Sequence, residues 1–252
     1  MVCSGHENHK EQSMKLLTLL LAPWLIVQGK RVRANTVRLP EAKGPRHGAQ
    51  GHGELLRVLV LGDSAAAGVG CECQTEAVSG QLAQALAQTY HVQWQLIAQS
   101  SLTCAGVLDL LKRSVVALND PIDAVLVSVG VNDVTRRTTV SQWRDDLNAL
   151  SRYLTETFQA RQIIYTSLPP MHVFPALPQP LRWYLGQQAR QLDKHLQHHC
   201  QTMTNAVYLD LNMPFEPQFI ATDGYHPSAA AATIWGQAAA ALVQRGGDQC
   251  SG

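Results

Sequence analysis

From residue 55 onward, short apolar runs alternate with segments of helical periodicity, and this alternation constrains the fold more than any other feature of the chain. The first of these runs, residues 55–61, continues without regular polar alternation, as expected of a strand that is buried on both faces. Five strands that are each followed by a helix predict an α/β protein, with a parallel, doubly wound sheet between two helical layers and right-handed crossovers. The predicted strands cover residues 56–61, 92–98, 123–129, 162–168 and 206–211, and the predicted helices lie near 76–89, 105–118, 141–158, 184–199 and 228–243.

The composition fits one such domain and narrows the classes of ligand. The chain has 252 residues, of which 46% are hydrophobic, so it can bury a substantial core. A net charge of +1 gives no reason to expect a nucleic-acid partner. Both the G-x-G-x-x-G loop and the P-loop are missing, so nucleotide and dinucleotide binding lose their main support. We expect a domain at residues 54–246, after an N-terminal extension at 1–53 and before a tail at 247–252.

Polar residues follow four of the predicted strands. Ser64 follows the first strand, directly after a glycine-containing turn, and Ser101 lies in the loop after the second. Asn132 follows the third strand, and Asp223 and His226 follow the fifth. Because the carboxyl ends of parallel strands open into one crevice, we expect these side chains to lie close together.

These five residues fit nucleophilic catalysis. A serine hydroxyl attacks an ester when a base takes its proton, and we expect His226 to serve Ser64 in this way. Asp223, three residues before the histidine, can hold the second ring nitrogen and stabilise the imidazolium. The backbone amide of Ser64, a loop amide near Ser101 and the side-chain amide of Asn132 could hold the oxyanion. Each residue also has a structural alternative, with Ser64 as a helix cap and Asn132 and Asp223 as turn residues.

Three motifs resemble those of the SGNH/GDSL hydrolase family, namely GDSAAAG at 62–68, GVND at 130–133 and DGYHP at 223–227. The resemblance covers about residues 55–245 and implies a flavodoxin-like, three-layer α/β/α fold with five parallel strands. It also implies an esterase or lipase-like enzyme, with Ser64 as nucleophile, His226 as base and Asp223 as its orienting acid. The Ser64 amide and Asn132 carry over as oxyanion donors, and neither a metal nor an organic cofactor is expected.

One position departs from the family pattern. The family usually has a glycine in the loop after the second strand, where its amide joins the oxyanion hole. The matching residue here is Ser101, with Ser100 as its rival. Serine supplies the same amide, but it is less permissive than glycine if the backbone must take a positive φ.

A proline-rich loop, residues 168–186, follows the fourth predicted strand. Its five prolines exclude a regular helix across most of it. We expect this loop to form a substrate wall or lid, in which Met171, Phe174 and Leu177 contact the substrate. The alternative is that these apolar side chains pack on the domain's own helices. His172 in the same loop is a weaker candidate base than the histidine of the DGYHP motif.

The N-terminal region carries an apolar run, Leu16–Val27, which is too short to span a bilayer as a helix. The run is followed by four cations, at Lys30, Arg31, Arg33 and Arg38. We expect residues 16–27 to make a peripheral membrane contact or to pack on the domain, rather than to direct export. These features favour a cytoplasmic or inner-membrane-associated location, with a periplasmic location as the alternative.

Two further expectations concern the rest of the chain. Residues 39–53 are rich in proline and glycine and predict a linker. Six cysteines are too few for a disulfide scaffold, so we expect free thiols. A bridge from Cys71 or Cys73 to Cys104 is the alternative.

Together these observations predict a serine esterase that hydrolyses small-molecule esters of short to medium acyl chains through an acyl-enzyme. A lysophospholipase, a thioesterase-like enzyme and a carbohydrate O-deacetylase are alternatives within the enzyme class. An acyl- or lipid-binding protein without catalytic activity, or a flavin binder of the same architecture, would be alternatives from other classes.

Overall fold

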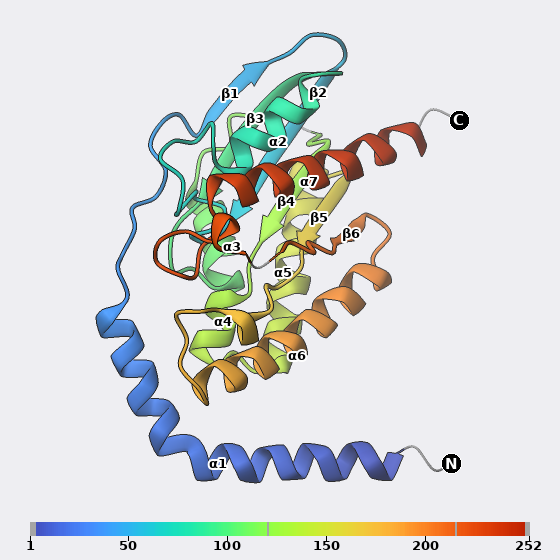
Figure 1. The fold of residues 1–252 in the computed structure, drawn as a ribbon. Coiled ribbons are helices and arrows are strands. Elements are labelled where there is room, and N and C mark those ends of the chain that lie inside the picture. The colour runs from blue at the N-terminus through green and yellow to red at the C-terminus, as the bar shows by residue number, and fades with distance from the viewer. Residues whose placement is uncertain (1–3, 120, 215, 250–252) are drawn as a thin grey trace.

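The computed structural model describes residues 4–119, 121–214 and 216–249, which form a six-stranded sheet between two layers of helices (Figure 1). The strands are β1 (His47–Gln50), β2 (Leu55–Gly62), β3 (His91–Ala98), β4 (Ala124–Ser128), β5 (Gln162–Thr166) and β6 (Ala206–Leu209). The α-helices are α1 (Ser4–Asn35), α2 (Val78–Leu86), α3 (Cys104–Arg113), α4 (Val131–Arg136), α5 (Val140–Phe158), α6 (Leu181–Thr202) and α7 (Ala229–Gln249). Two 3₁₀ turns, η1 (Met171–Val173) and η2 (Pro217–Phe219), lie in the loops after β5 and β6.

The sheet contains the five predicted parallel strands and one additional strand. Its order is β1-β3-β2-β4-β5-β6, and every pair from β3 to β6 is parallel. β1 pairs antiparallel with β3 at the edge. The three-layer α/β/α prediction is confirmed, but residues 39–53, predicted as a linker, supply this sixth strand. β1 has the sequence HGAQ, which lacks the apolar run that identifies the other strands.

The central strands divide two apolar cores between the two faces of the sheet. Leu59 and Leu61 of β2 point into the core under α3, α5 and α6, whereas Val58 and Val60 point into the core under α2 and α7. This alternation follows from the pleat, which sends successive side chains to opposite faces. Figure 1 shows α7 lying beside α2 on one face of the sheet.

α1 includes the apolar run and lies against the domain. Pro23 lies inside this helix, and Figure 1 shows α1 changing direction near its middle, as expected where a proline removes a backbone hydrogen bond. After the bend, Leu25 is only 3% exposed and joins the core beside α6. Among the helices that the structure describes, none combines the length and the hydrophobicity that a membrane span requires.

The cysteines that the structure describes are free thiols. Cys71, Cys73, Cys104 and Cys200 form no disulfide, so the alternative bridge to Cys104 is not made. The remaining two cysteines lie outside the described residues.

Candidate active site

The turn after β2 presents Ser64 at the carboxyl edge of the sheet. β2 ends at Gly62, where an added Cβ would lie 2.4 Å from the carbonyl oxygen of Ser128 at the end of β4. Only glycine fits there, so this residue allows the two strand ends to approach closely. Asp63, which is 3% exposed, accepts a hydrogen bond of 3.1 Å from the backbone N–H of Ala65. This bond holds the turn that carries Ser64.

His226 and Asp223 lie in the loop before α7 and complete a hydrogen-bonded chain with Ser64. The Nε2 atom of His226 lies 2.8 Å from Ser64 Oγ, and its Nδ1 atom lies 2.5 Å from Asp223 Oδ2. The Oδ1 atom of Asp223 accepts hydrogen bonds from the backbone N–H groups of Tyr225 (2.9 Å) and His226 (3.1 Å). The D-x-x-H turn therefore folds the carboxylate back onto the ring, and the three predicted residues meet in one chain.

Burial and hydrogen bonding shift the pKa values of Asp223 and Asp63 in opposite directions. Burial would raise the pKa of Asp223, but the hydrogen bonds from the His226 ring and from two backbone N–H groups hold this pKa below its ordinary value. Asp223 can therefore stabilise positive charge on the imidazole when the ring accepts a proton. Burial raises the pKa of Asp63 to about 6, despite the hydrogen bonds from Ala65 and Asn132 and the nearby His226 ring.

The predicted oxyanion donors line the same cavity as Ser64. The backbone N–H groups of Ser64 and Ser101 donate to no group in the described part of the chain. One amide hydrogen of Asn132 bonds to Asp63 Oδ2 at 3.0 Å, which leaves the second hydrogen available to a ligand. Ser101 has a φ of 69°, whereas Ser100 is not among the residues with positive φ. The backbone conformation that glycine favours therefore falls at Ser101.

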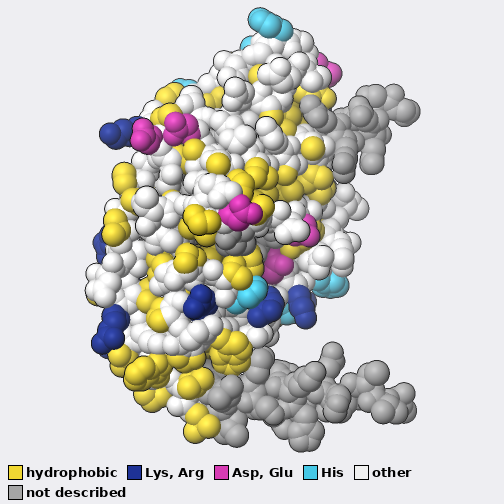
Figure 2. Space-filling model, in the orientation of Figure 1, with side chains coloured by type: hydrophobic (Ala, Val, Ile, Leu, Met, Phe, Trp, Pro, Cys, Tyr) yellow, Lys and Arg dark blue, Asp and Glu magenta, His cyan; other side chains and the backbone are white. Residues whose placement is uncertain are grey.

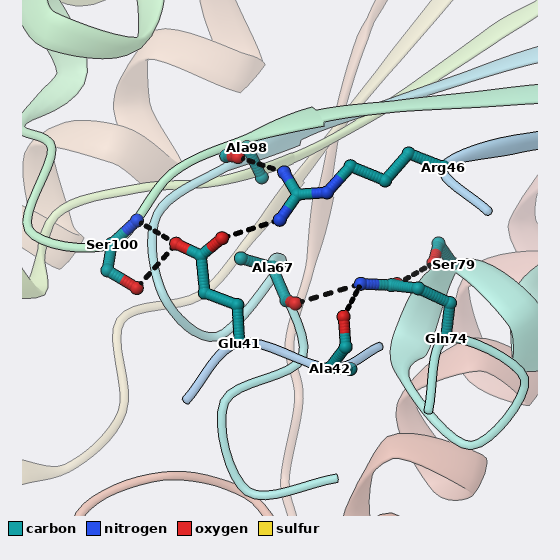
Figure 3. A network of polar contacts seen from close by, with 8 residues as sticks. All are labelled: Glu41, Ala42, Arg46, Ala67, Gln74, Ser79, Ala98 and Ser100. Carbon is teal, nitrogen blue, oxygen red and sulfur yellow. Dashed lines mark hydrogen bonds and ion pairs between the residues drawn. The ribbon is translucent and has the colours of Figure 1, made fainter. Parts of the chain in front are cut away.

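A carboxylate from the predicted linker holds the loop that contains Ser101. Figure 3 shows Glu41 Oε1 accepting hydrogen bonds from both the backbone N–H and the hydroxyl of Ser100, each at 2.7 Å. The other carboxylate oxygen pairs with Arg46, which also donates to the carbonyl oxygen of Ala98 at 2.6 Å. Burial would raise the pKa of Glu41, but the bonds from Ser100 and Arg46 hold it below the ordinary value. Glu41 therefore anchors the loop as a charged group.

The same N-terminal segment is tied to the turn that carries Ser64. Gln74, 1% exposed, donates through its side-chain amide to the carbonyl oxygens of Ala42 (3.1 Å) and Ala67 (3.0 Å), and accepts from Ser79 (Figure 3). Ala67 in turn donates its backbone N–H to the carbonyl oxygen of Asp63 at 2.9 Å. Sequence reasoning missed this network because its polar groups come from loops without a repeating pattern.

The cavity at Ser64 has a volume of about 1240 Å³ and extends under the proline-rich loop. Met171, Phe174 and Leu177 line it, but all three are at most 4% exposed and also belong to the core. The alternative that these side chains pack within the domain is therefore confirmed, and their contact with a substrate stays a prediction. The ring of Phe174 meets that of Tyr225 edge to face, 6.1 Å between centroids, which places the loop beside the D-x-x-H turn. His172 is not part of the lining.

α1 supplies another wall of this cavity, which the sequence did not predict. Leu25, Gly29 and Val32 line it from one face of the helix, and Thr36 continues this wall just beyond its end. These residues follow one another at spacings of three and four, as on one face of a helix. The spacing is visible in the sequence, but nothing there indicates that this face meets the domain at the site.

A second serine–histidine pair lies inside the core, away from the cavity. Ser151 Oγ lies 2.8 Å from His199 Nε2 and 2.6 Å from the hydroxyl of Tyr165. Ser151 is 1% exposed, and none of the three residues lines the cavity of Ser64. No carboxylate of the described residues bonds to this His199 ring. The pair satisfies buried polar groups and gives a substrate no access to the hydroxyl.

Comparisons with known proteins found a matching family model and a similar protein. A family model described as the GDSL-like Lipase/Acylhydrolase family matches residues 60–234. The chain is similar to the GDSL-like esterase Rv1075c of Mycobacterium tuberculosis, with 26% identity over 185 residues that span 70% of this chain but only 58% of that protein.

Solved structures share the fold at lower identity. A lipase/acylhydrolase from Enterococcus faecalis superposes with a TM-score of 0.54 at 19% identity, covering 77% of this chain and 96% of the other. An acetylxylan esterase, Axe2, from Geobacillus stearothermophilus also gives a TM-score of 0.54, at 20% identity, covering 77% and 95% of the two chains. The match of the family model over most of the sheet and both motif-bearing ends shows that this chain belongs to the GDSL-like lipase/acylhydrolase family of ester-hydrolysing serine hydrolases.

Proposed function

We propose that this protein is a serine esterase that hydrolyses carboxylic esters of short to medium acyl chains through an acyl-enzyme. The observation that carries the proposal is the hydrogen-bonded chain from Ser64 through His226 to Asp223, with distances of 2.8 and 2.5 Å. Ser64, His226 and Asp223 line a cavity that is large enough for a small ester. The buried pair of Ser151 and His199 does not line this cavity.

Acylation begins when Ser64 Oγ attacks the ester carbonyl carbon and His226 Nε2 takes the hydroxyl proton. The carbonyl oxygen becomes an oxyanion, and the tetrahedral intermediate collapses as the alcohol leaves with the proton from His226. A water molecule then gives a proton to His226 and attacks the acyl group on Ser64. The acid leaves, and Ser64 regains its proton from the ring.

Three donors support the oxyanion in both halves of this reaction. The three donors are the backbone N–H groups of Ser64 and Ser101 and the side-chain amide of Asn132, and all three residues line the cavity. Among the described residues, no acceptor takes the two backbone hydrogens or the second amide hydrogen of Asn132. Donors that are held in place before the reaction stabilise the developing charge without reorganising. Asp63 fixes the Asn132 amide, and Glu41 fixes the loop of Ser101.

The walls of the cavity favour an acyl group over a sugar. Met171, Phe174 and Leu177 supply apolar surface, which suits an acyl chain and offers a polysaccharide few partners. Lysophospholipase and thioesterase activity would use the same residues. Carbohydrate O-deacetylation is the second candidate, because one structural neighbour is an acetylxylan esterase.

The test is the hydrolysis of p-nitrophenyl esters, from acetate to long acyl chains, by the wild type and by Ser64→Ala. We expect the substitution to lower turnover by about 10³-fold or more. Ser151→Ala is the matched control, because it removes the other serine that bonds to a histidine, and it should keep wild-type turnover per folded molecule. Loss of activity in the control but not in Ser64→Ala would overturn the assignment. A folded wild type that cleaves no ester would favour an acyl-binding protein instead.

A further inference from the structure

We infer that the outer face of α1 docks on an anionic lipid bilayer and that the cavity takes its ester substrate from that surface. The inference about docking stands on α1 alone, whereas the inference about the substrate rests on the esterase function proposed above.

The second half of α1 is a fixed part of the cavity wall. The side-chain amide of Gln28 donates to the carbonyl oxygen of Gln179 at 2.7 Å, and its oxygen accepts from the backbone N–H of Leu181 at 3.1 Å. Gln179 lies in the proline-rich loop just before α6, and Leu181 is the first residue of α6, so α1 is joined to the point where this loop enters the helix. Leu25 is buried beneath this contact. The helix therefore has a definite inner face toward the cavity and a definite outer face.

The outer face of α1 is apolar and exposed. Leu20, Trp24 and Val27 are 73%, 59% and 53% exposed, and their spacing places them on one side of the helix. Leu19 is 71% exposed, and Ile26, which also lines the cavity, is 44% exposed. Figure 2 shows hydrophobic side chains gathered at the lower end of the molecule, where this part of α1 lies. A helix that is apolar on both its inner and outer faces is incompletely buried by its own domain, and such a patch marks an interaction site.

Positive charge directly follows this apolar face. Lys30, Arg31, Arg33 and Arg38 come after it, and the chain has no aspartate or glutamate between Leu19 and Pro40. A surface that presents apolar side chains beside cations complements an anionic bilayer, whose acyl region takes the apolar groups and whose headgroups take the charges. A second copy of this chain is a poorer match, because a symmetric contact would bring these cations against one another.

The mouth of the cavity continues the same charge pattern. Lys30, Arg33 and Arg38 belong to its lining, together with Arg136 and Arg137 of the α4 region. The acidic residues in that lining are Asp63 and Asp223, which belong to the site around Ser64. A cationic rim above apolar walls suits an acyl ester with an anionic headgroup. With α1 on the bilayer, such an amphiphile could enter the cavity from the membrane surface.

Vesicle binding tests the docking separately from the chemistry. The full chain is sedimented with sucrose-loaded vesicles of phosphatidylcholine alone or with 30% phosphatidylglycerol, and the bound fraction gives a partition coefficient. The variants Trp24→Asp and Arg31→Glu change outward residues that do not line the cavity. Val115→Asp and Arg152→Glu are the controls, because both replace exposed residues far along the chain from α1.

We expect wild-type binding that is at least about tenfold stronger with phosphatidylglycerol, since each cation near an anionic surface contributes roughly fivefold to binding. Trp24→Asp and Arg31→Glu should each weaken binding by about fivefold or more, while the controls and the cleavage of p-nitrophenyl acetate stay unchanged. Hydrolysis of an anionic lysophospholipid presented in vesicles should fall in parallel with binding.

Three outcomes would overturn the docking inference. The first is that the wild type binds neither kind of vesicle. The second is that the control substitutions weaken vesicle binding as much as the α1 substitutions do. The third is a wild-type dimer in light scattering that Trp24→Asp converts to a monomer, which would identify a second copy as the occupant. If vesicles bind but no ester is cleaved, docking stands and the proposed esterase function fails. If p-nitrophenyl acetate is cleaved but vesicle-borne lysophospholipid is not, the membrane substrate is excluded.

Discussion

Removal of the Glu41 carboxylate should slow turnover without weakening substrate binding. Glu41→Ala removes both hydrogen bonds to Ser100, each of 2.7 Å, and the ion pair with Arg46. The side chain of Glu41 is 28% exposed, so water can replace part of what is lost. We therefore take about 1 kcal/mol for each charged hydrogen bond to Ser100, below the usual range for such bonds. The total of about 2 kcal/mol corresponds to a fall in Tm of about 4–8 °C for a protein of this size.

The effect on catalysis follows from the position of Ser101, which comes directly after the anchored residue. Loss of one oxyanion donor costs about 10²- to 10³-fold in kcat, and a loosened loop should lose part of that. We expect kcat for p-nitrophenyl esters to fall by about 10- to 100-fold in Glu41→Ala, with KM changed less than about twofold. An oxyanion donor acts mainly in the transition state, so a positioning residue such as Glu41 should affect kcat rather than KM.

Arg46→Ala is the matched control for this experiment. It removes the ion pair and the hydrogen bond to the Ala98 carbonyl oxygen but leaves both bonds between Glu41 and Ser100 in place, so kcat should stay within about threefold of the wild type. Steady-state kinetics and thermal unfolding of both variants separate the two effects. If Glu41→Ala lowers Tm but keeps wild-type kcat, or if Arg46→Ala lowers kcat equally, the carboxylate does not position the loop and the reasoning is refuted.

Three further predictions concern single residues of the site and its surroundings. Asp223→Asn should lower kcat by about 10³- to 10⁴-fold in the p-nitrophenyl ester assay, because a neutral amide cannot stabilise the imidazolium. A wild-type kcat in this variant would show that Asp223 does not assist His226 in catalysis. Ser101→Gly should relieve the backbone strain at the φ of 69° and raise the free energy of unfolding in urea titrations by up to about 1 kcal/mol. The variant should retain activity, and a lower free energy of unfolding would show that this conformation carries no strain. Burial raises the pKa of Asp133 from 3.8 to about 6, so its folded form binds a proton more tightly than the unfolded form. The stability of the wild type relative to Asp133→Asn should therefore rise as the pH falls from 7 to 4, by up to about 3 kcal/mol, and a constant difference across this range would contradict the shifted pKa.

The parallel sheet and the residues at its edge could be predicted because each has a local signature. β2, β4, β5 and β6 are largely apolar runs of four to eight residues, as buried strands require, whereas the first half of β3 alternates polar with apolar residues. The chemistry of Ser64, Asn132, Asp223 and His226 follows from their place after these strands, because parallel strands end at one edge. Ser101 could also be predicted as the residue that replaces the usual glycine, and its φ of 69° is the conformation that glycine favours.

Features that depend on contacts between distant segments had no such signature. β1 is a four-residue polar strand, and its pairing is decided by the open edge of β3 rather than by its own residues. Glu41 joins the site only because β1 brings the preceding residues to the loop after β3, 59 positions further along the chain.

Periodicity and residue type are local properties, so they were enough to predict the five parallel strands, the chemistry at their carboxyl edge and the apolar, cation-flanked character of residues 16–38. Long-range packing sets which face of α1 closes the cavity, which carboxylate anchors the loop of Ser101, and which of the two serines bonded to a histidine lines a cavity. Each of these depends on packing between elements that are far apart in the chain, and packing at that range is set by the whole core rather than by any one segment.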